Sequence, residues 1–232
     1  MKWLRSYYND FTALLFPDLC GACGKNLFKG EVELCTSCIY HLPRTTFHQD
    51  PQNKVARQFW GRVPLVQAGA FLHFQKGTRV QQLMHQLKYN KRQNLGRRLG
   101  ELYGLELAES DTFIIPDLII PVPLHPKKLR KRGYNQSKAI AEGLGKVLGV
   151  PASELYLKRS VYTDTQTKRS RFARYENMQL AFEISHADEL HNKHILLVDD
   201  VITTGSTLEA CALNLQKNAT LSISIAALAY AD

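Results

Sequence analysis

The chain has 232 residues, a net charge of +9 and a pI near 9.3. Apolar residues make up 44% of it and charged residues 22%, which excludes disordered, collagen-like and low-complexity classes. At about 150 residues per domain, we expect one main domain and one accessory module. The positive charge favours a polyanionic partner, either a nucleic acid or a polyphosphate ligand, although a merely basic surface gives the same total.

The amino-terminal segment does not resemble a signal peptide or a membrane anchor. Charged residues interrupt its first ten positions, and no apolar run approaches 18 residues. We therefore expect a soluble, cytoplasmic protein without a transmembrane segment. Residues 3–15 carry apolar side chains near helical spacing, which predicts an amphipathic helix that docks on the core rather than on a membrane or a partner.

Four cysteines follow this helix in two C-x-x-C pairs that are separated by eleven residues. The pairs are Cys20 with Cys23 and Cys35 with Cys38. This spacing is typical of a structural Zn²⁺ site with four thiolate ligands, which leaves no position open for catalytic water. Two disulfides or four unrelated thiols are the alternatives, and the absence of a secretion signal disfavours stable disulfides. The fifth cysteine, Cys211, is expected in the core.

The remainder of the chain alternates between strand and helix patterns. A linker is expected at 44–64, and residues 1–64 then form the amino-terminal helix and zinc module, with the main domain at 65–232. Alternating strands and helices predict an α/β fold with a mostly parallel sheet and helices on both faces. Strands are expected at 67–74, 118–122, 155–158, 195–198 and 221–229, and helices at 79–89, 93–109, 136–148 and 205–217.

The apolar strand at 195–198 leads directly into two carboxylates and a hydroxyl-rich turn. Backbone N–H groups and hydroxyls of such a turn can hold a phosphate at a helix amino terminus. Asp199 and Asp200 are then placed to accept hydrogen bonds from the ribose hydroxyls of the same ligand. Alternatively, the acids simply end a strand and the threonines cap a helix, but this explains only one or two of the residues. The predicted phosphate loop consists of Val201, Thr203, Thr204, Gly205, Ser206 and Thr207.

This segment resembles the phosphoribosyl pyrophosphate (PRPP) motif of type I phosphoribosyltransferases, and nearly the whole chain resembles one branch of them, the ComF family of DNA-uptake proteins. The resemblance includes the cysteine module and several further motifs, and it implies a Rossmann-like type I phosphoribosyltransferase fold, with Mg²⁺ accompanying PRPP. It also implies Asp199 and Asp200 as catalytic residues if the chain is an enzyme. The further motifs are Leu87-Lys88-Tyr89, Pro121 to His125, Arg130 to Gln136, Gln166-Thr167, Ser170-Arg171, Arg174 and Asn177.

Three segments, 88–98, 127–132 and 158–174, hold 16 of the 30 lysines and arginines. The resemblance places the second segment in the loop that grips pyrophosphate and the third in a mobile lid. Tyrosines and a phenylalanine lie among these cations, which is also typical of single-strand binders. Lys88, Arg130 and Arg132 are candidate PRPP contacts, and the candidate DNA contacts are Lys88, Arg92, Arg169, Arg171 and Arg174. His125 is at most a secondary ligand contact.

Three functions remain open from the sequence. The first is a competence protein that binds PRPP and single-stranded DNA and assists DNA uptake during natural transformation, with a DNA-uptake helicase or a channel protein at the inner membrane as a partner. The second is an active phosphoribosyltransferase with an unidentified acceptor. The third is a non-enzymatic sensor of PRPP.

Overall fold

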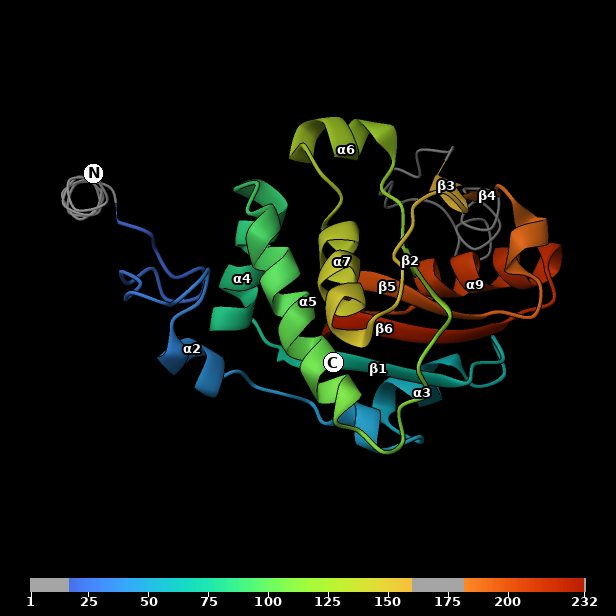
Figure 1. The fold of residues 1–232 in the computed structure, drawn as a ribbon, viewed down its shortest axis with the longest axis horizontal. Coiled ribbons are helices and arrows are strands. Elements are labelled where there is room, and N and C mark those ends of the chain that lie inside the picture. Colours follow the sequence, from blue (N-terminus) through green and yellow to red (C-terminus); the bar gives the residue numbers. More distant parts are fainter. Residues whose placement is uncertain (1–16, 160–181, 232) are drawn as a thin grey trace.

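A parallel four-stranded sheet forms the centre of the fold, in the part of the chain that this computed structural model describes, residues 17–159 and 182–231 (Figure 1). The strand order is β1-β6-β5-β2. Apolar residues fill the strands because helices cover both faces of the sheet. The strands are β1 (Gln67–Phe74), β2 (Leu118–Pro121), β5 (His194–Ile202) and β6 (Ser222–Ala231).

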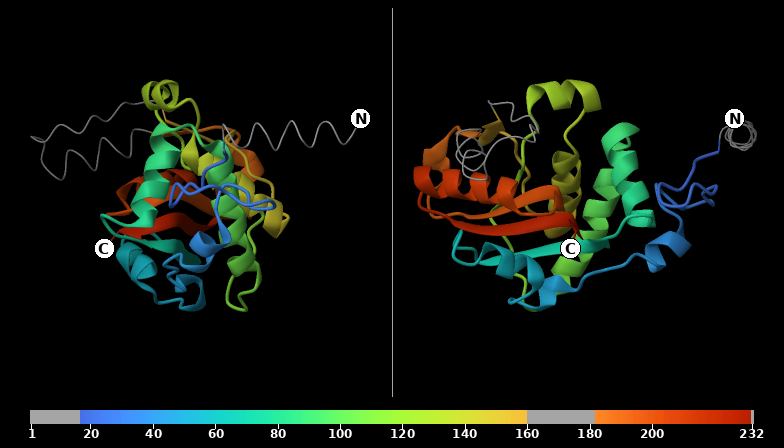
Figure 2. Two further views of the ribbon diagram at one scale, coloured as in Figure 1. Left: turned by 90° about the vertical axis from the view of Figure 1, so that its left-hand side faces the viewer. Right: turned by 180° about the vertical axis from the view of Figure 1, so that it is seen from behind.

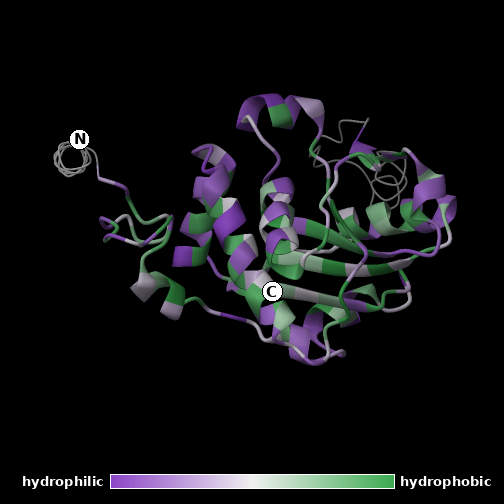
Figure 3. Ribbon diagram, in the orientation of Figure 1, coloured by the Kyte–Doolittle hydropathy of each residue, from purple (hydrophilic) through white to green (hydrophobic). Residues whose placement is uncertain are grey.

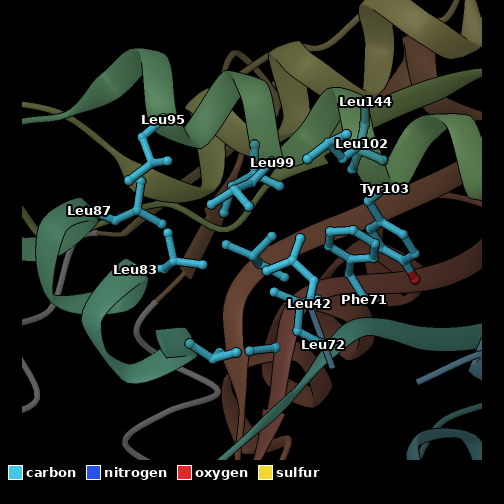
Figure 4. Packing of buried hydrophobic residues seen from close by; sticks show 14 of the residues in the cluster. Leu42, Phe71, Leu72, Leu83, Leu87, Leu95, Leu99, Leu102, Tyr103 and Leu144 are labelled. Carbon is cyan, nitrogen blue, oxygen red and sulfur yellow. The ribbon is translucent and has the colours of Figure 1, made fainter. Parts of the chain in front are cut away.

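Helices α4 (Arg79–Tyr89), α5 (Gln93–Ala108) and α7 (Gln136–Leu148) cover one face of the sheet. Leucines from all three helices pack together there, and the ring of Tyr103 stacks on Phe71 with the centroids 5.2 Å apart (Figure 4). Helices α3 (Lys54–Phe59) and α9 (Ser206–Asn218) cover the other face. The predicted α/β fold with helices on both faces is confirmed.

Helices α5 and α7 lie unusually close together because glycines face each other across the contact. A Cβ atom on Gly100 would lie 2.2 Å from the carbonyl oxygen of Ile140, and one on Gly143 would lie 2.1 Å from that of Arg97. Backbone meets backbone here, so no side chain can move aside. This contact holds the amino terminus of α7 against the end of β5.

The smaller elements lie around this framework, and two of them differ from the sequence-based expectation. The segment 44–64, expected as a linker, contains α3, whose Val55 and Phe59 are buried against the sheet. The cationic segment after β2, expected as a loop, forms the short helix α6. These elements are α2 (Thr36–Tyr40), η1 (Phe47–Gln49), α6 (Pro126–Arg132), β3 (Leu157–Arg159), β4 (Phe182–Ile184) and η2 (Ala187–Leu190).

Helix α6 projects away from the other helices and is hydrophilic along most of its length (Figures 2 and 3). Pro126 occupies its first turn, the Nδ1 of His125 accepts a hydrogen bond from the Lys127 N–H, and Gly133 ends the helix with a positive φ of 82°. Strands β3 and β4 pair antiparallel outside the main sheet. The helix predicted at 3–15 and the whole connection at 160–177 lie outside the described residues.

We predict that Gly100→Ala destabilises the protein, because the added methyl group must force α5 away from α7. Overpacking of this kind costs about 1–3 kcal/mol, more than the gain in helix propensity. Urea unfolding followed by circular dichroism measures the change. The control is Leu105→Ala on the exposed side of the same helix, which should change the stability by less than about 0.5 kcal/mol. Equal stability of the two variants would contradict the close packing.

Candidate ligand site at the carboxyl edge of the sheet

Two adjacent carboxylates at the end of β5 form the centre of the site. The Oδ1 of Asp199 accepts hydrogen bonds from the Asp200 N–H at 2.8 Å and from the Ser137 hydroxyl at 3.0 Å. Asp200 forms an ion pair with Lys88 at the carboxyl end of α4, with Nζ 3.0 Å from Oδ2. Elements that are distant in sequence thus meet at the edge where ligands of parallel sheets bind.

The environment raises the pKa of Asp199 to about 7. Burial is the largest cause and the negative charge of Asp200 the second, and the hydrogen bonds from Asp200 and Ser137 together with the charge of Lys88 oppose them. The carboxyl pair therefore carries less than its full negative charge near neutral pH. Such a carboxyl pair can form hydrogen bonds with the neutral hydroxyl groups of a ligand without burying two full negative charges.

Val201, which is predicted as part of the phosphate loop, still belongs to β5 and pairs with Ala229. The loop 203–205 leads from the end of this strand into α9. Gly205 has a φ of +70°, and a Cβ atom there would lie 2.7 Å from Cζ of the buried Phe59 ring. Only glycine fits both the backbone conformation and this contact. Thr203 and Thr204 are exposed, and the hydroxyls of Thr204 and Ser206 lie 2.9 Å apart. The turn therefore presents hydroxyls and the amino terminus of α9 to solvent, as a phosphate cradle requires.

Residues of α3 and of the turn after it donate hydrogen bonds to the carbonyl groups of this loop. The Gln58 Nε2 donates to the Thr203 carbonyl at 2.6 Å, and the Arg62 Nη1 donates to the Thr204 carbonyl at 3.2 Å. Arg62 also pairs with the buried Glu209 in the first turn of α9. These bonds hold two carbonyls on the side of α3. Because a peptide's N–H points opposite to its carbonyl, they favour N–H groups directed away from α3.

Gln58, Arg62 and Ser137 support the site but are not among the site residues that the sequence predicts. Gln58 and Arg62 were assigned to a linker because Pro51, Gly61 and Pro64 surround them. A helix signal was nevertheless present, since Asn53 caps α3 and precedes apolar residues at helical spacing. No comparable local signal marks Ser137, whose partner is 62 positions away.

The motif 132–136 has a positioning role in the structure. The Tyr134 hydroxyl donates to the Leu87 carbonyl at 2.7 Å, next to Lys88. Asn135 caps α7 by accepting from the Ser137 N–H and donates to the Val122 carbonyl. The Arg132 Nη1 donates to the Gln136 side chain at 2.6 Å. The segment 132–136 therefore positions both Lys88 and Ser137 beside the carboxylates. Arg132, at the start of this segment, is partly exposed.

Cations gather beside the carboxylate pair. Desolvation lowers the pKa of Lys128, and the charges of Arg159, Arg132 and Lys88 lower it further, against the opposing charge of Asp200. Desolvation likewise lowers the pKa of Arg159, whose guanidinium carbon lies 5.3 Å from the Phe182 ring centroid. Repulsion between these cations destabilises the site without a ligand, and a bound polyanion would relieve it. Arg130 lies on the exposed part of α6.

Some of the predicted contact residues are engaged within the protein. Arg92 pairs with Glu33 at 2.7 Å and donates to the Leu19 carbonyl at 2.9 Å, which holds the cysteine module against α5. Lys88 pairs with Asp200 as described. Arg169, Arg171 and Arg174 lie outside the described residues. Cys211 is fully buried in α9, which confirms its expected place in the core.

The four cysteines of the amino-terminal module are close enough to hold one metal ion. Their sulfur atoms all lie within 4.8 Å of one another, and those of Cys23 and Cys35 are 3.9 Å apart. A tetrahedron with metal–sulfur bonds of about 2.3 Å has edges of about 3.8 Å. The Cys35 N–H also points at the Cys20 sulfur at 3.3 Å, which favours a thiolate there. The donor set therefore fits a four-coordinate metal.

Comparison with known proteins identifies the class first. Residues 131–232 match the model of the phosphoribosyl transferase domain, and the fold is that of a type I phosphoribosyltransferase. Among solved structures, the chain has a weak likeness to the allosteric regulatory enzyme of purine biosynthesis (18% identical, TM-score 0.40, 61% of this chain and 29% of that one). A second such likeness is to the Pyrococcus horikoshii purine phosphoribosyltransferase (24% identical, TM-score 0.36, 58% of this chain and 73% of that one).

Two relatives with a similar sequence have names that refer to competence and to DNA utilization. The chain is 29% identical to competence protein F of Haemophilus influenzae over 206 residues, which cover 87% of this chain and 80% of the relative. It is 32% identical to the DNA utilization protein YhgH of Escherichia coli K12, over 62% of this chain and 63% of that protein, which is less than two thirds of its length. These likenesses agree with the resemblance to the ComF family that the motifs indicate. No helix among the described residues is long and apolar enough to cross a membrane.

Proposed function

We propose that this protein binds PRPP with Mg²⁺ at the carboxyl edge of its sheet, binds single-stranded DNA on the adjacent cationic surface, and assists DNA uptake during natural transformation. One observation carries the proposal. Asp199, Asp200 and the segment 201–207 lie together with cations from α4, α6 and β3. The names of the relatives, which refer to competence and DNA utilization, support the biological role.

In the proposed complex, the 5′-phosphate lies in the loop that Gln58 and Arg62 support. Asp199 and Asp200 accept hydrogen bonds from the ribose hydroxyls, and Lys88 neutralises Asp200 or turns to the ligand. Mg²⁺ neutralises part of the pyrophosphate charge when it is bound. Lys128, Arg132 and Arg159 then contribute positive charge at the pyrophosphate end, where their mutual repulsion is relieved.

An active phosphoribosyltransferase is the second candidate, and the same carboxylate pair favours it. An enzyme of this kind stabilises positive charge at the ribose while pyrophosphate leaves, and Asp199 and Asp200 lie where the ribose is proposed to bind. Release of pyrophosphate from PRPP in the presence of acceptor bases decides between transfer and binding alone.

We also propose that the four cysteines hold one Zn²⁺ ion and that residues 18–43 depend on it. Structural zinc contributes about 10–16 kcal/mol in small modules. Because Arg92 and Leu95 contact this module, metal loss should also disturb the start of α5.

Elemental analysis of protein prepared without chelator should therefore find one zinc per chain. Removal of the metal should strongly reduce protection of amide hydrogens within 18–43, as hydrogen exchange measures, because the regular structure of the module is limited to the short helix α2 and isolated bridges. Protein without metal whose four thiols are paired as disulfides would contradict the assignment.

We predict that Asp200→Ala and Thr204→Ala each weaken PRPP binding at least about ten-fold, because a hydrogen bond to a charged group contributes about 1.5–3 kcal/mol. Calorimetric titration with PRPP and Mg²⁺ measures the affinity. Asp111→Ala replaces an exposed acid at the opposite end of α5 and should bind like the parent. If either site variant also binds like the parent, the loop does not hold the ligand.

DNA binding should depend strongly on salt and little on sequence. If about five phosphates are neutralised, the logarithm of the affinity should fall against the logarithm of the salt concentration with a slope near −3.5, at about −0.7 per contact. Lys127, Arg130 and Lys131 are exposed on α6. Changing all three to Gln should flatten the slope by about 2, as fluorescence anisotropy with labelled oligothymidylate measures.

The matched control changes three exposed lysines away from this surface, Lys25, Lys29 and Lys217, to Gln. This variant loses the same charge and should bind with the slope of the parent protein. Equal slopes in both triple variants would show that net charge alone attracts the strand. A parent slope near zero would refute the DNA-binding half of the proposal.

A further inference from the structure

Trp60 is exposed at the end of α3, with 58% of its surface accessible to solvent. The guanidinium carbon of Arg57, one turn earlier, lies 5.9 Å from the centroid of its ring. A single exposed aromatic residue is common on protein surfaces and by itself indicates nothing. Trp60 is of interest because the segment that carries it contacts the phosphate loop.

The neighbours of Trp60 connect it directly to that loop. Gln58 and Arg62 donate hydrogen bonds to the carbonyls of Thr203 and Thr204, and the ring of Phe59 contacts Gly205. Trp60 lies between these residues in sequence, but its own side chain faces solvent. The indole is therefore held on a rigid element at the rim of the proposed phosphate site.

The segment that contains Trp60 is basic. Residues 51–66 contain three cations and no acid. Arg62 is paired with Glu209. Lys54 and Arg57 lie on the exposed side of α3, the short helix that ends just before the tryptophan. An exposed ring with the Arg57 guanidinium at its side fits a polyanion that carries flat aromatic groups.

We propose that Trp60 is a stacking platform for a base of single-stranded DNA, and that Arg57 and Lys54 contact the neighbouring backbone phosphates. This inference rests on the DNA-binding half of the proposed function and adds a second face to it. In this proposal, a DNA strand that binds α6 on one side of the phosphate loop also contacts α3 on the other side. Stacking needs no particular base, so this contact is independent of sequence.

Tryptophan fluorescence tests the contact directly, because the chain has two tryptophans, Trp3 and Trp60. In a Trp3→Phe variant, the emission comes from Trp60 alone. Oligothymidylate should quench this emission along the same curve that anisotropy gives for binding. An abasic oligonucleotide of equal length should bind through its charge and leave the emission unchanged. Quenching by the abasic strand would refute stacking.

Affinity measurements on variants provide the second readout. Trp60→Ala should weaken oligothymidylate binding at least about five-fold and leave PRPP binding unchanged, whereas Trp60→Phe should keep most of the affinity because it keeps a ring. Phe28→Ala removes a still more exposed ring, on the cysteine module, and should have no effect. Normal DNA affinity in Trp60→Ala, or unquenched emission with oligothymidylate, overturns the inference while the proposed function stands. If the parent protein binds no DNA, both fail together.

Discussion

The placement of two adjacent carboxylates at the end of a buried strand constrains the rest of this structure. Asp199 and Asp200 repel each other, and burial adds to the cost of their charge. Lys88 from α4 and Ser137 from α7 compensate from one face of the sheet. The close contact of α5 with α7, and the bond from Tyr134 to the end of α4, can be understood as the means of holding these two partners in place.

The phosphate loop has a corresponding support on the other face. Arg62 links α3 to Glu209 and to the loop carbonyl at Thr204, and Phe59 fills the space that Gly205 leaves. The carboxylates and the loop therefore depend on separate groups of residues. A ligand that carries both a phosphate and vicinal hydroxyls would be held from both faces, which is consistent with the proposed binding of PRPP.

The cysteine module is attached to the same framework. Arg92, at the start of α5, pairs with Glu33 and bonds to the Leu19 carbonyl, only four positions after Lys88. In the proposed function, the module therefore contributes to the ligand site through the corner between α4 and α5, without touching the ligand. The proposed zinc site, which has no open coordination position, would then act by stabilising this corner.

The sequence by itself predicted the α/β class, most strand and helix positions, the likeness to competence and DNA-utilization proteins, and the cysteine cluster. These features depend on local periodicity and on motifs that are contiguous or closely spaced. The resemblance to phosphoribosyltransferases also assigned Lys88 and the cations of 127–132 to the same ligand as the loop after β5. The ligands themselves, and the contacts assigned to residues 169–174, remain predictions.

Only the tertiary structure decided which of these cations are available and what supports the loop. Lys88 and Arg92 looked alike as basic residues, yet one pairs with Asp200 and the other with Glu33, because each partner comes from a distant segment. The segment 44–64 looked like a linker, since its prolines and glycine outweighed a short helical signal. Its role became visible only where Phe59 and Arg62 meet Gly205 and Glu209, more than 140 positions later, and no local pattern encodes a contact across that separation.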